Sequence, residues 1–190
     1  MVSSLNGYLA FLGLLAAERL VELVISQRNA ARAFARGGVE TGQRHYRVMV
    51  VLHSLFLVAC VAEVVALRRP FPGGIGFAAL GVALVAQALR YWSIVSLGEL
   101  WNTRIIVVPG LSPVTRGPYR YLRHPNYVAV VLELAAVPLI HGAWVTAVVF
   151  SLANAGLLLV RIRAEEAALG AAYADAFANR PRFIPEVPRG

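Results

Sequence analysis

The sequence contains no lysine, a single cysteine and few charged residues of any kind. All 18 basic residues are arginine, and charged residues make up 15% of the 190 residues, against about 25% in ordinary soluble domains. The one cysteine, Cys60, lies within an apolar run, which excludes a disulfide framework and a metal cluster of the CxxC type. We therefore expect an inert buried thiol and no metal site.

The arginines form no aromatic-interleaved patch of the kind that binds nucleic acid, although the formal net charge is +8. They flank apolar runs instead, as arginines do at the ends of membrane helices. Apolar residues make up 58% of the chain, and a small soluble domain exposes too much of its surface to hide them all. The composition predicts an integral membrane protein in contact with lipids, without a nucleic-acid partner.

Long apolar stretches cover residues 5–25, 48–67, 75–97 and 125–160. A helix of about 20 residues crosses the hydrocarbon core, and residues 125–160 would measure roughly 50 Å as one helix, too long for a single crossing. We therefore predict a helical hairpin that turns near residues 138–142. The expected fold is all-α, an integral membrane bundle of about five transmembrane helices, with this C-terminal hairpin and an amphipathic tail in one domain over residues 1–190.

Arginines are unevenly distributed between the connecting segments. They gather before the second and fourth expected helices and in the tail, whereas the other side of the membrane offers only Arg68 and Arg69. Because cytoplasmic segments carry the excess of arginine, we predict a cytoplasmic C-terminus and an external N-terminus. The polar, motif-like sequence then faces the cytoplasm, and we expect the protein in the bacterial cytoplasmic membrane.

Three polar segments are candidates for chemistry. The first, residues 101–110, runs from Trp101 to Pro109-Gly110, a turn signal, with little helical pattern. An interfacial loop anchored by Trp101 at the headgroup level would explain it equally well. This segment alone does not decide between the two interpretations.

The second segment, residues 115–127, crowds three arginines, three tyrosines and a histidine at the start of an apolar helix. Pro125 suits the first helical turn, where a missing N–H costs nothing. The free N–H groups at that end favour an anion such as a carboxylate, and His124 would lie beside them as a donor. The alternative is an aromatic belt with snorkelling arginines, which needs no ligand.

The third segment, residues 161–169, leaves the last apolar helix. Its spacing brings Arg161 and Glu165 together on one helical face, and Arg163 and Glu166 are paired similarly. Helix-surface ion pairs contribute only tenths of a kcal/mol and are the ordinary explanation. Ionisable residues at the end of a membrane span are, however, candidates for function.

Together the segments give a more specific pattern. Gly-Pro-Tyr at 117–119 precedes Arg-His-Pro-x-Tyr at 123–127, then come a hairpin, Arg-Ile-x-x-Glu-Glu-x-x-Leu at 161–169, and a tail with Arg-Phe-Ile-Pro at 182–185. This order resembles the isoprenylcysteine carboxyl methyltransferase family of membrane S-adenosylmethionine enzymes. The resemblance covers roughly residues 75–187, so that residues 1–74 would supply two N-terminal helices and residues 75–190 a family-like core.

The resemblance implies a role for particular residues. It places Glu165 against the cofactor S-adenosylmethionine and Arg161 against the methyl acceptor, as the catalytic pair. The remaining implied cofactor-binding residues lie in the preceding loop and at the helix mouth: Leu111, Ser112, Pro113, Val114, Tyr119, His124, Pro125, Asn126 and Tyr127. The family lacks a Rossmann glycine loop, and this sequence lacks one too.

Residues 101–110 and 123–127 look closer to bacterial members near type III polyketide synthases, which are similar to O-methyltransferases acting on alkylpyrone or alkylresorcinol lipids. The expected activity is methyl transfer to a carboxylate, enol or phenol oxygen of a lipophilic acceptor, such as these lipids or isoprenylcysteine. Three alternatives remain open: a phospholipid N-methyltransferase, a sterol-reductase-like enzyme that uses NADPH, and a membrane scaffold or transporter. The sequence leaves the oligomeric state and the acceptor open.

Overall fold

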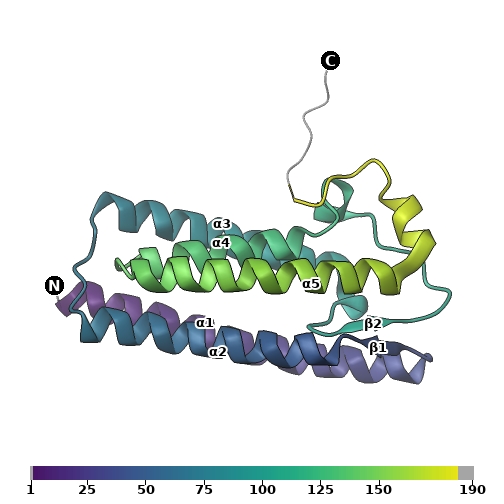
Figure 1. Cartoon of the computed structure of the whole chain (residues 1–190), viewed down its shortest axis with the longest axis horizontal. Coiled ribbons are helices and arrows are strands. Elements are labelled where there is room, and N and C mark those ends of the chain that lie inside the picture. The colour runs from purple at the N-terminus through teal and green to yellow at the C-terminus, as the bar shows by residue number, and fades with distance from the viewer. Residues whose placement is uncertain (1, 184–190) are drawn as a thin grey trace, which may run out of the picture.

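A computed structural model describes residues 2–183, which fold mainly into five α-helices (Figure 1). These helices are α1 (Val2–Ala35), α2 (Gln43–Ala66), α3 (Gly74–Leu97), α4 (Pro125–Leu139) and α5 (Trp144–Ala176). The predicted all-α bundle is confirmed. The helices run back and forth along one long axis, so that α1 begins at one end of the molecule and α5 finishes at the other.

Three helices of the described chain are long and apolar enough to cross a membrane: α2, α3 with its 3₁₀ extension to Leu100, and α5. Large apolar side chains such as Val58, Val85 and Leu152 stay exposed on them, as a lipid-facing surface requires. α4 is a shorter apolar helix. α1 covers the expected 5–25 span but continues to Ala35, and Glu18, Arg19 and Glu22 interrupt its apolar run.

The hairpin between α4 and α5 forms where it was predicted. Pro138 lies in the last turn of α4, and Gly142 adopts a left-handed φ of 71° just before α5. Glu63 of α2 accepts the backbone N–H groups of Val145 at 3.2 Å and Thr146 at 2.7 Å. A carboxylate in this position satisfies unpaired amides at the start of α5 and complements the helix dipole.

The last helix continues beyond the apolar stretch that ends at residue 160 and carries the third motif on this extension, in agreement with the helical spacing read from residues 161–169. Gly170, with φ 68° and ψ −160°, breaks this extension near its end. The following chain folds back, so that the backbone N–H groups of Arg123 and His124 donate to Pro181 and Arg182 at 3.0 and 3.3 Å. Of the predicted tail, residues 184–185 and Arg189 lie outside the described residues.

Two short strands speak against one of the two interpretations of residues 101–110, the interfacial loop anchored by Trp101. β1 (Val39–Thr41) pairs antiparallel with β2 (Ile105–Val107), with Glu40 opposite Ile106. Trp101 is only 3% exposed, so it does not anchor the chain at the headgroups. The β-branched residues of β2 favour a strand, but their partner strand lies more than sixty residues earlier in the chain, and no local pattern there indicates the pairing.

Two one-turn 3₁₀ helices complete the polar end of the molecule, η1 (Gly98–Leu100) and η2 (Gly117–Arg120). In Figure 1 the strands, η2, the long loops and the chain after α5 gather at the end of the bundle where α3 and α5 finish. The apolar core lies toward the other end, between residues such as Tyr8, Phe56, Cys60 and Leu134. This arrangement leaves a space between the core and the polar loops.

Candidate active site

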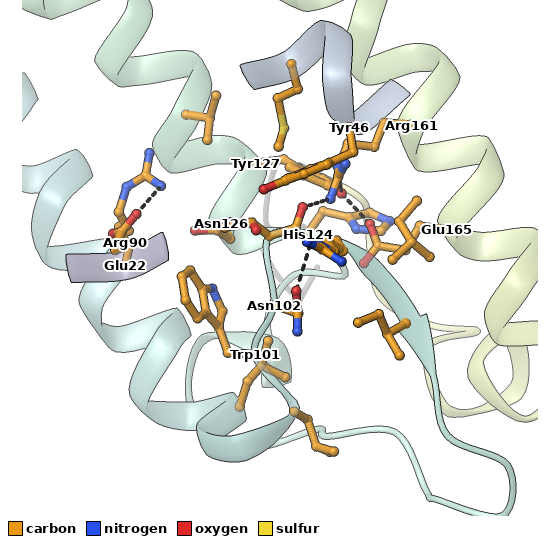
Figure 2. A pocket seen from close by; sticks show the side chains of 18 of the residues that line it. Glu22, Tyr46, Arg90, Trp101, Asn102, His124, Asn126, Tyr127, Arg161 and Glu165 are labelled. Carbon is orange, nitrogen blue, oxygen red and sulfur yellow. Dashed lines mark hydrogen bonds and ion pairs between the residues drawn. The ribbon is translucent and has the colours of Figure 1, made fainter. Parts of the chain in front are cut away.

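A cavity of about 410 Å³ opens between the helices and the polar loops. Its wall is assembled from residues of all five α-helices, from β2, and from the loops on either side of β2. Figure 2 shows this wall from close by. The volume lies within the range of small-molecule sites, which are mostly apolar with a few placed polar groups.

The residues proposed from sequence meet at this cavity, with one exception. Its wall includes Leu111, Ser112, Pro113, Val114, Tyr119, His124, Asn126, Tyr127, Arg161 and Glu165. Pro125 is buried behind the wall, where it occupies the first turn of α4. Its position is that of a residue that starts a helix, so direct contact between Pro125 and a ligand stays a prediction.

Arg161 is the centre of the hydrogen-bond network at this end of the cavity. The side chain is 4% exposed; its Nε donates to the Tyr127 hydroxyl at 2.9 Å and its Nη2 to the Thr103 carbonyl at 2.5 Å. The Tyr127 hydroxyl in turn donates to the Glu165 carboxylate. Arg161 and Glu165 are therefore linked through Tyr127, and Arg161 Nη1 has no hydrogen-bond partner.

Glu166 takes different partners from those that the sequence suggested. Its carboxylate lies 3.0 Å from His124 Nε2 and accepts two hydrogen bonds from Arg182, at 3.0 and 2.6 Å. Pairing with Arg163 along the helix surface was therefore wrong, because the chain after α5 folds back and brings Arg182 closer. His124 is 4% exposed and is held at the mouth of α4 by this contact.

Aromatic side chains close one side of the cavity. Tyr119, Tyr173 and Phe177 form a buried cluster, and the Tyr173 hydroxyl donates to the Arg123 carbonyl at 3.2 Å. Burial, followed by the negative charge of Glu165, raises the pKa of the Tyr119 phenol above its ordinary value. Tyr119 therefore stays protonated near neutral pH and presents a neutral ring to the cavity.

Further polar residues of this region were not identified as site residues from the sequence. Ser26 Oγ of α1 donates to Asn102 Oδ1 at 2.8 Å, which fixes the loop that offers the Thr103 carbonyl to Arg161. Trp101 Nε1 and Asn154 Oδ1 are buried at the cavity wall without a hydrogen-bond partner. Asn102 lies in the first polar segment, but a serine within an apolar helix carries no comparable signal.

The cavity continues to a second polar region between the helices. Arg90 of α3 donates from Nε to Glu133 Oε1 of α4 at 3.3 Å, and Glu22 Oε2 of α1 lies 3.7 Å from Arg90 Nη1. Glu22, Arg90 and Glu133 all line the cavity. Glu22 and Arg90 fall within the apolar stretches 5–25 and 75–97, and charges in such positions commonly indicate function in membrane helices.

Comparisons with known proteins identify the family to which this part of the chain is similar. The sequence model of the isoprenylcysteine carboxyl methyltransferase (ICMT) family matches residues 79–171, which include α4 and most of the cavity wall. An uncharacterized protein of Bacillus subtilis, YpbQ, is 42% identical over 159 residues, which cover 83% of this chain and 94% of that protein.

Two more distant relatives are each 28% identical to the chain. An uncharacterized protein of Haemophilus influenzae aligns over 152 residues, or 80% of this chain and 88% of its own length. The protein-S-isoprenylcysteine O-methyltransferase of Schizosaccharomyces pombe aligns over 109 residues, or 56% of this chain and 46% of its own length.

Proposed function

The chain belongs to the isoprenylcysteine carboxyl methyltransferase family, and from this premise we propose that it transfers a methyl group from S-adenosylmethionine to an oxygen of a lipophilic acceptor. Membership of the family and the apolar helices make it a membrane methyltransferase. The methyl donor, the oxygen nucleophile and the roles of the site residues are our proposal. The residues that line the cavity support it.

The cavity wall fits a cofactor rich in hydrogen-bonding groups. Asn126 Oδ1 and Trp101 Nε1 are buried there without partners, and buried polar atoms of this kind normally find one. We assign cofactor binding to the loop 111–114 and to Tyr119, His124, Asn126, Tyr127 and Glu165, while Pro125 starts α4 behind them. When bound, S-adenosylmethionine supplies an electrophilic methyl group.

Arg161 carries the proposal. Its guanidinium is buried in the cavity wall, two of its nitrogens are fixed by Tyr127 and Thr103, and the third, Nη1, has no hydrogen-bond partner. A positive group held in this way is suited to an anionic oxygen, because charge-assisted hydrogen bonds are about twice as strong as neutral ones. We therefore assign to Arg161 the acceptor oxygen, and to Glu165 contact with the cofactor.

For this methyl transfer, the main task of the protein is to position the two reactants. A carboxylate or acidic enol is already anionic near neutral pH, so no strong general base is needed. Holding two reactants together can lower the barrier by several kcal/mol. We propose acceptors with an acidic oxygen and an apolar body: alkylpyrones, alkylresorcinols or isoprenylcysteine. An oxygen acceptor agrees with the name of the Schizosaccharomyces pombe relative.

The proposal is tested by separating methyl transfer from cofactor binding. Detergent-purified protein is incubated with a labelled methyl donor and a bacterial lipid extract, and S-adenosylhomocysteine binding is measured by calorimetry. In Arg161→Ala, we expect transfer to fall roughly 100-fold while binding largely survives. Arg161→Lys should not rescue fully, because an ammonium lacks the planar two-point grip.

Arg163→Ala is the matched control, since Arg163 lies on the same helix, is exposed and does not line the cavity. It should keep both transfer and binding. Glu165→Ala should instead weaken S-adenosylhomocysteine binding. Near-normal transfer by Arg161→Ala would rule out its contact with the acceptor, and a protein that binds NADPH but not S-adenosylhomocysteine would favour the sterol-reductase-like alternative.

The orientation of the site is part of the proposal. We place the cavity mouth at the cytoplasmic face of the bacterial cytoplasmic membrane, because the arginine-rich segments 28–47 and 104–123 lie at that end of the bundle. The cofactor would enter from the cytoplasm and the acceptor from the bilayer. The test is a C-terminal reporter that works only outside the cytoplasm. If this reporter is active, the orientation is the reverse of the one proposed.

A further inference from the structure

The cavity has a second polar end that methyl transfer at Arg161 does not use. Figure 2 shows Glu22 and Arg90 on one side of the cavity and Arg161 and Glu165 on the other, with Asn126 between them. The wall also contains apolar side chains from several helices, including Leu15, Phe56, Leu134 and Leu158. An elongated ligand with an apolar middle would therefore meet polar side chains at both of its ends.

The second end belongs to a charged cluster with an unequal number of charges. Arg19 Nη1 lies 2.9 Å from Glu22 Oε2 and Arg19 Nη2 lies 3.3 Å from Glu18 Oε2, and Arg90 pairs with Glu133. Three carboxylates thus face two guanidiniums, which leaves a formal charge of −1. In a site removed from water, an unbalanced negative charge favours a positive or hydrogen-bond-donating partner.

Among the carboxylate oxygens of this cluster, Glu22 Oε1 is the buried one without a hydrogen-bond partner; Arg19 Nε and Nη1 also make no hydrogen bond, although Nη1 lies 2.9 Å from Glu22 Oε2. Glu22 is 6% exposed, and its Oε1 has no hydrogen-bond partner, whereas its Oε2 faces both arginines. A buried carboxylate oxygen left without a donor costs the full desolvation of that group. A donor on a bound molecule would remove that cost, because Glu22 lines the cavity.

We propose that Glu22, supported by Arg90 and Glu133, binds a hydrogen-bond-donating group at the end of the acceptor opposite to the methylated oxygen. An ammonium should bind best, because it balances the charge of the cluster, and a hydroxyl should follow. The acceptor is then polar at both ends with an apolar middle. A hydrocarbon tail alone would leave Glu22 Oε1 without a donor. This inference rests on the proposed function for the direction in which the acceptor lies.

The test compares three probes that differ only at the far end. Straight-chain fatty acids, ω-hydroxy acids and ω-amino acids of matched chain lengths are added to the detergent-purified protein, and thermal stabilisation is measured without a methyl donor. The KM for methyl ester formation is measured in parallel. An apolar wall would favour the methyl-terminated acid, whereas we expect the ω-amino acid to bind about tenfold more tightly than that acid, with the ω-hydroxy acid between them.

Two variants assign the preference to the proposed atom. Glu22→Gln should abolish the preference for the ω-amino acid, because the amide carries no charge. Glu18→Gln is the matched control: it removes the same charge from the same helix and cluster, but Glu18 is not part of this cavity wall. Because Glu18→Gln also makes the cluster formally neutral, it should weaken the preference, but less than Glu22→Gln, which removes the charge at the cavity wall itself.

Equal stabilisation by the three probes, no stabilisation by any of them, or a preference that survives Glu22→Gln overturns the inference. These outcomes are distinct from failure of the proposed function. Loss of S-adenosylhomocysteine binding and methyl transfer with an intact ω-amino preference would reject the methyl transfer and keep the polar site. Normal methyl transfer without the preference would do the opposite.

Discussion

The two polar ends of the cavity both contain buried guanidinium and carboxylate groups, and they differ in which of these atoms lack a hydrogen-bond partner. At the Arg161 end, a buried guanidinium is fixed by a phenol and a carbonyl, and one of its nitrogens stays unpaired. At the Glu22 end, both guanidiniums form ion pairs with carboxylates, while Glu22 Oε1, Arg19 Nε and Arg19 Nη1 make no hydrogen bond. We therefore propose an anion as the ligand of the first end and a hydrogen-bond donor as the ligand of the second.

The two ends also differ in how they are assembled. The Arg161 end combines loop, helix mouth and helix extension, where backbone groups such as the Thr103 carbonyl take part. The Glu22 end has only side chains from α1, α3 and α4, surrounded by apolar helices. Removing one partner from such a buried ionic cluster leaves an uncompensated charge, which is far more costly than losing an exposed pair.

The largest effect is expected for Glu133→Ala, which would leave Arg90 buried without its main partner. The free energy of unfolding should fall by about 3–5 kcal/mol. Denaturant titration in detergent measures it. The control is Glu99→Ala. The ion pairs of Glu99 with Arg32 and Arg36 are about half exposed, so this variant should lose at most about 1 kcal/mol of unfolding free energy. Equal losses would mean that burial does not distinguish the two sites.

A smaller effect is expected at the other end for His124→Ala. His124 lines the cavity and is held by Glu166, so S-adenosylhomocysteine binding should weaken several-fold, by about 1–2 kcal/mol. Calorimetry on the folded variant measures this. Arg120→Ala, an exposed change in the same motif outside the cavity wall, should leave binding unchanged. Unchanged affinity in His124→Ala would remove this histidine from the cofactor site.

Tyr127→Phe tests the link between Arg161 and Glu165. The change removes only the hydroxyl that accepts from Arg161 and donates to Glu165, and the net loss should be about 0.5–1.5 kcal/mol. We expect the loss mainly in kcat for methyl transfer, with a smaller change in S-adenosylhomocysteine binding. Tyr121→Phe, at an exposed ring outside the wall, is the control. A purely structural hydroxyl would lower stability and leave kcat unaltered.

The smallest effect is expected for Arg182→Ala. Arg182 makes two good hydrogen bonds to Glu166, but its side chain is 53% exposed, so water and salt screen the pair. Stability should fall by less than about 1 kcal/mol, and by less still at high salt. The salt dependence of the unfolding midpoint checks this. A loss as large as that of Glu133→Ala would show that the pair locks the whole site.

Much of the fold followed from local patterns. The hairpin turn at Pro138 and Gly142 and the start of α4 at Pro125 were predicted correctly, because proline and glycine restrict the backbone wherever they stand. The predicted site residues, apart from Pro125, line one cavity; their roles stay predictions. The β-ribbon and the Glu166–Arg182 pair were missed, because each joins segments that no local pattern relates.

The sequence by itself determined that the chain is a bundle of apolar helices with its polar motifs at one end, because hydrophobic burial and arginine placement depend mainly on composition and spacing. The tertiary structure alone decided which charges meet. Glu22, Arg90 and Glu133 come from three helices, and only their packing turns isolated charges in apolar runs into one cluster beside the cavity. The same packing decided that Arg161 reaches Glu165 through Tyr127 and keeps one nitrogen free.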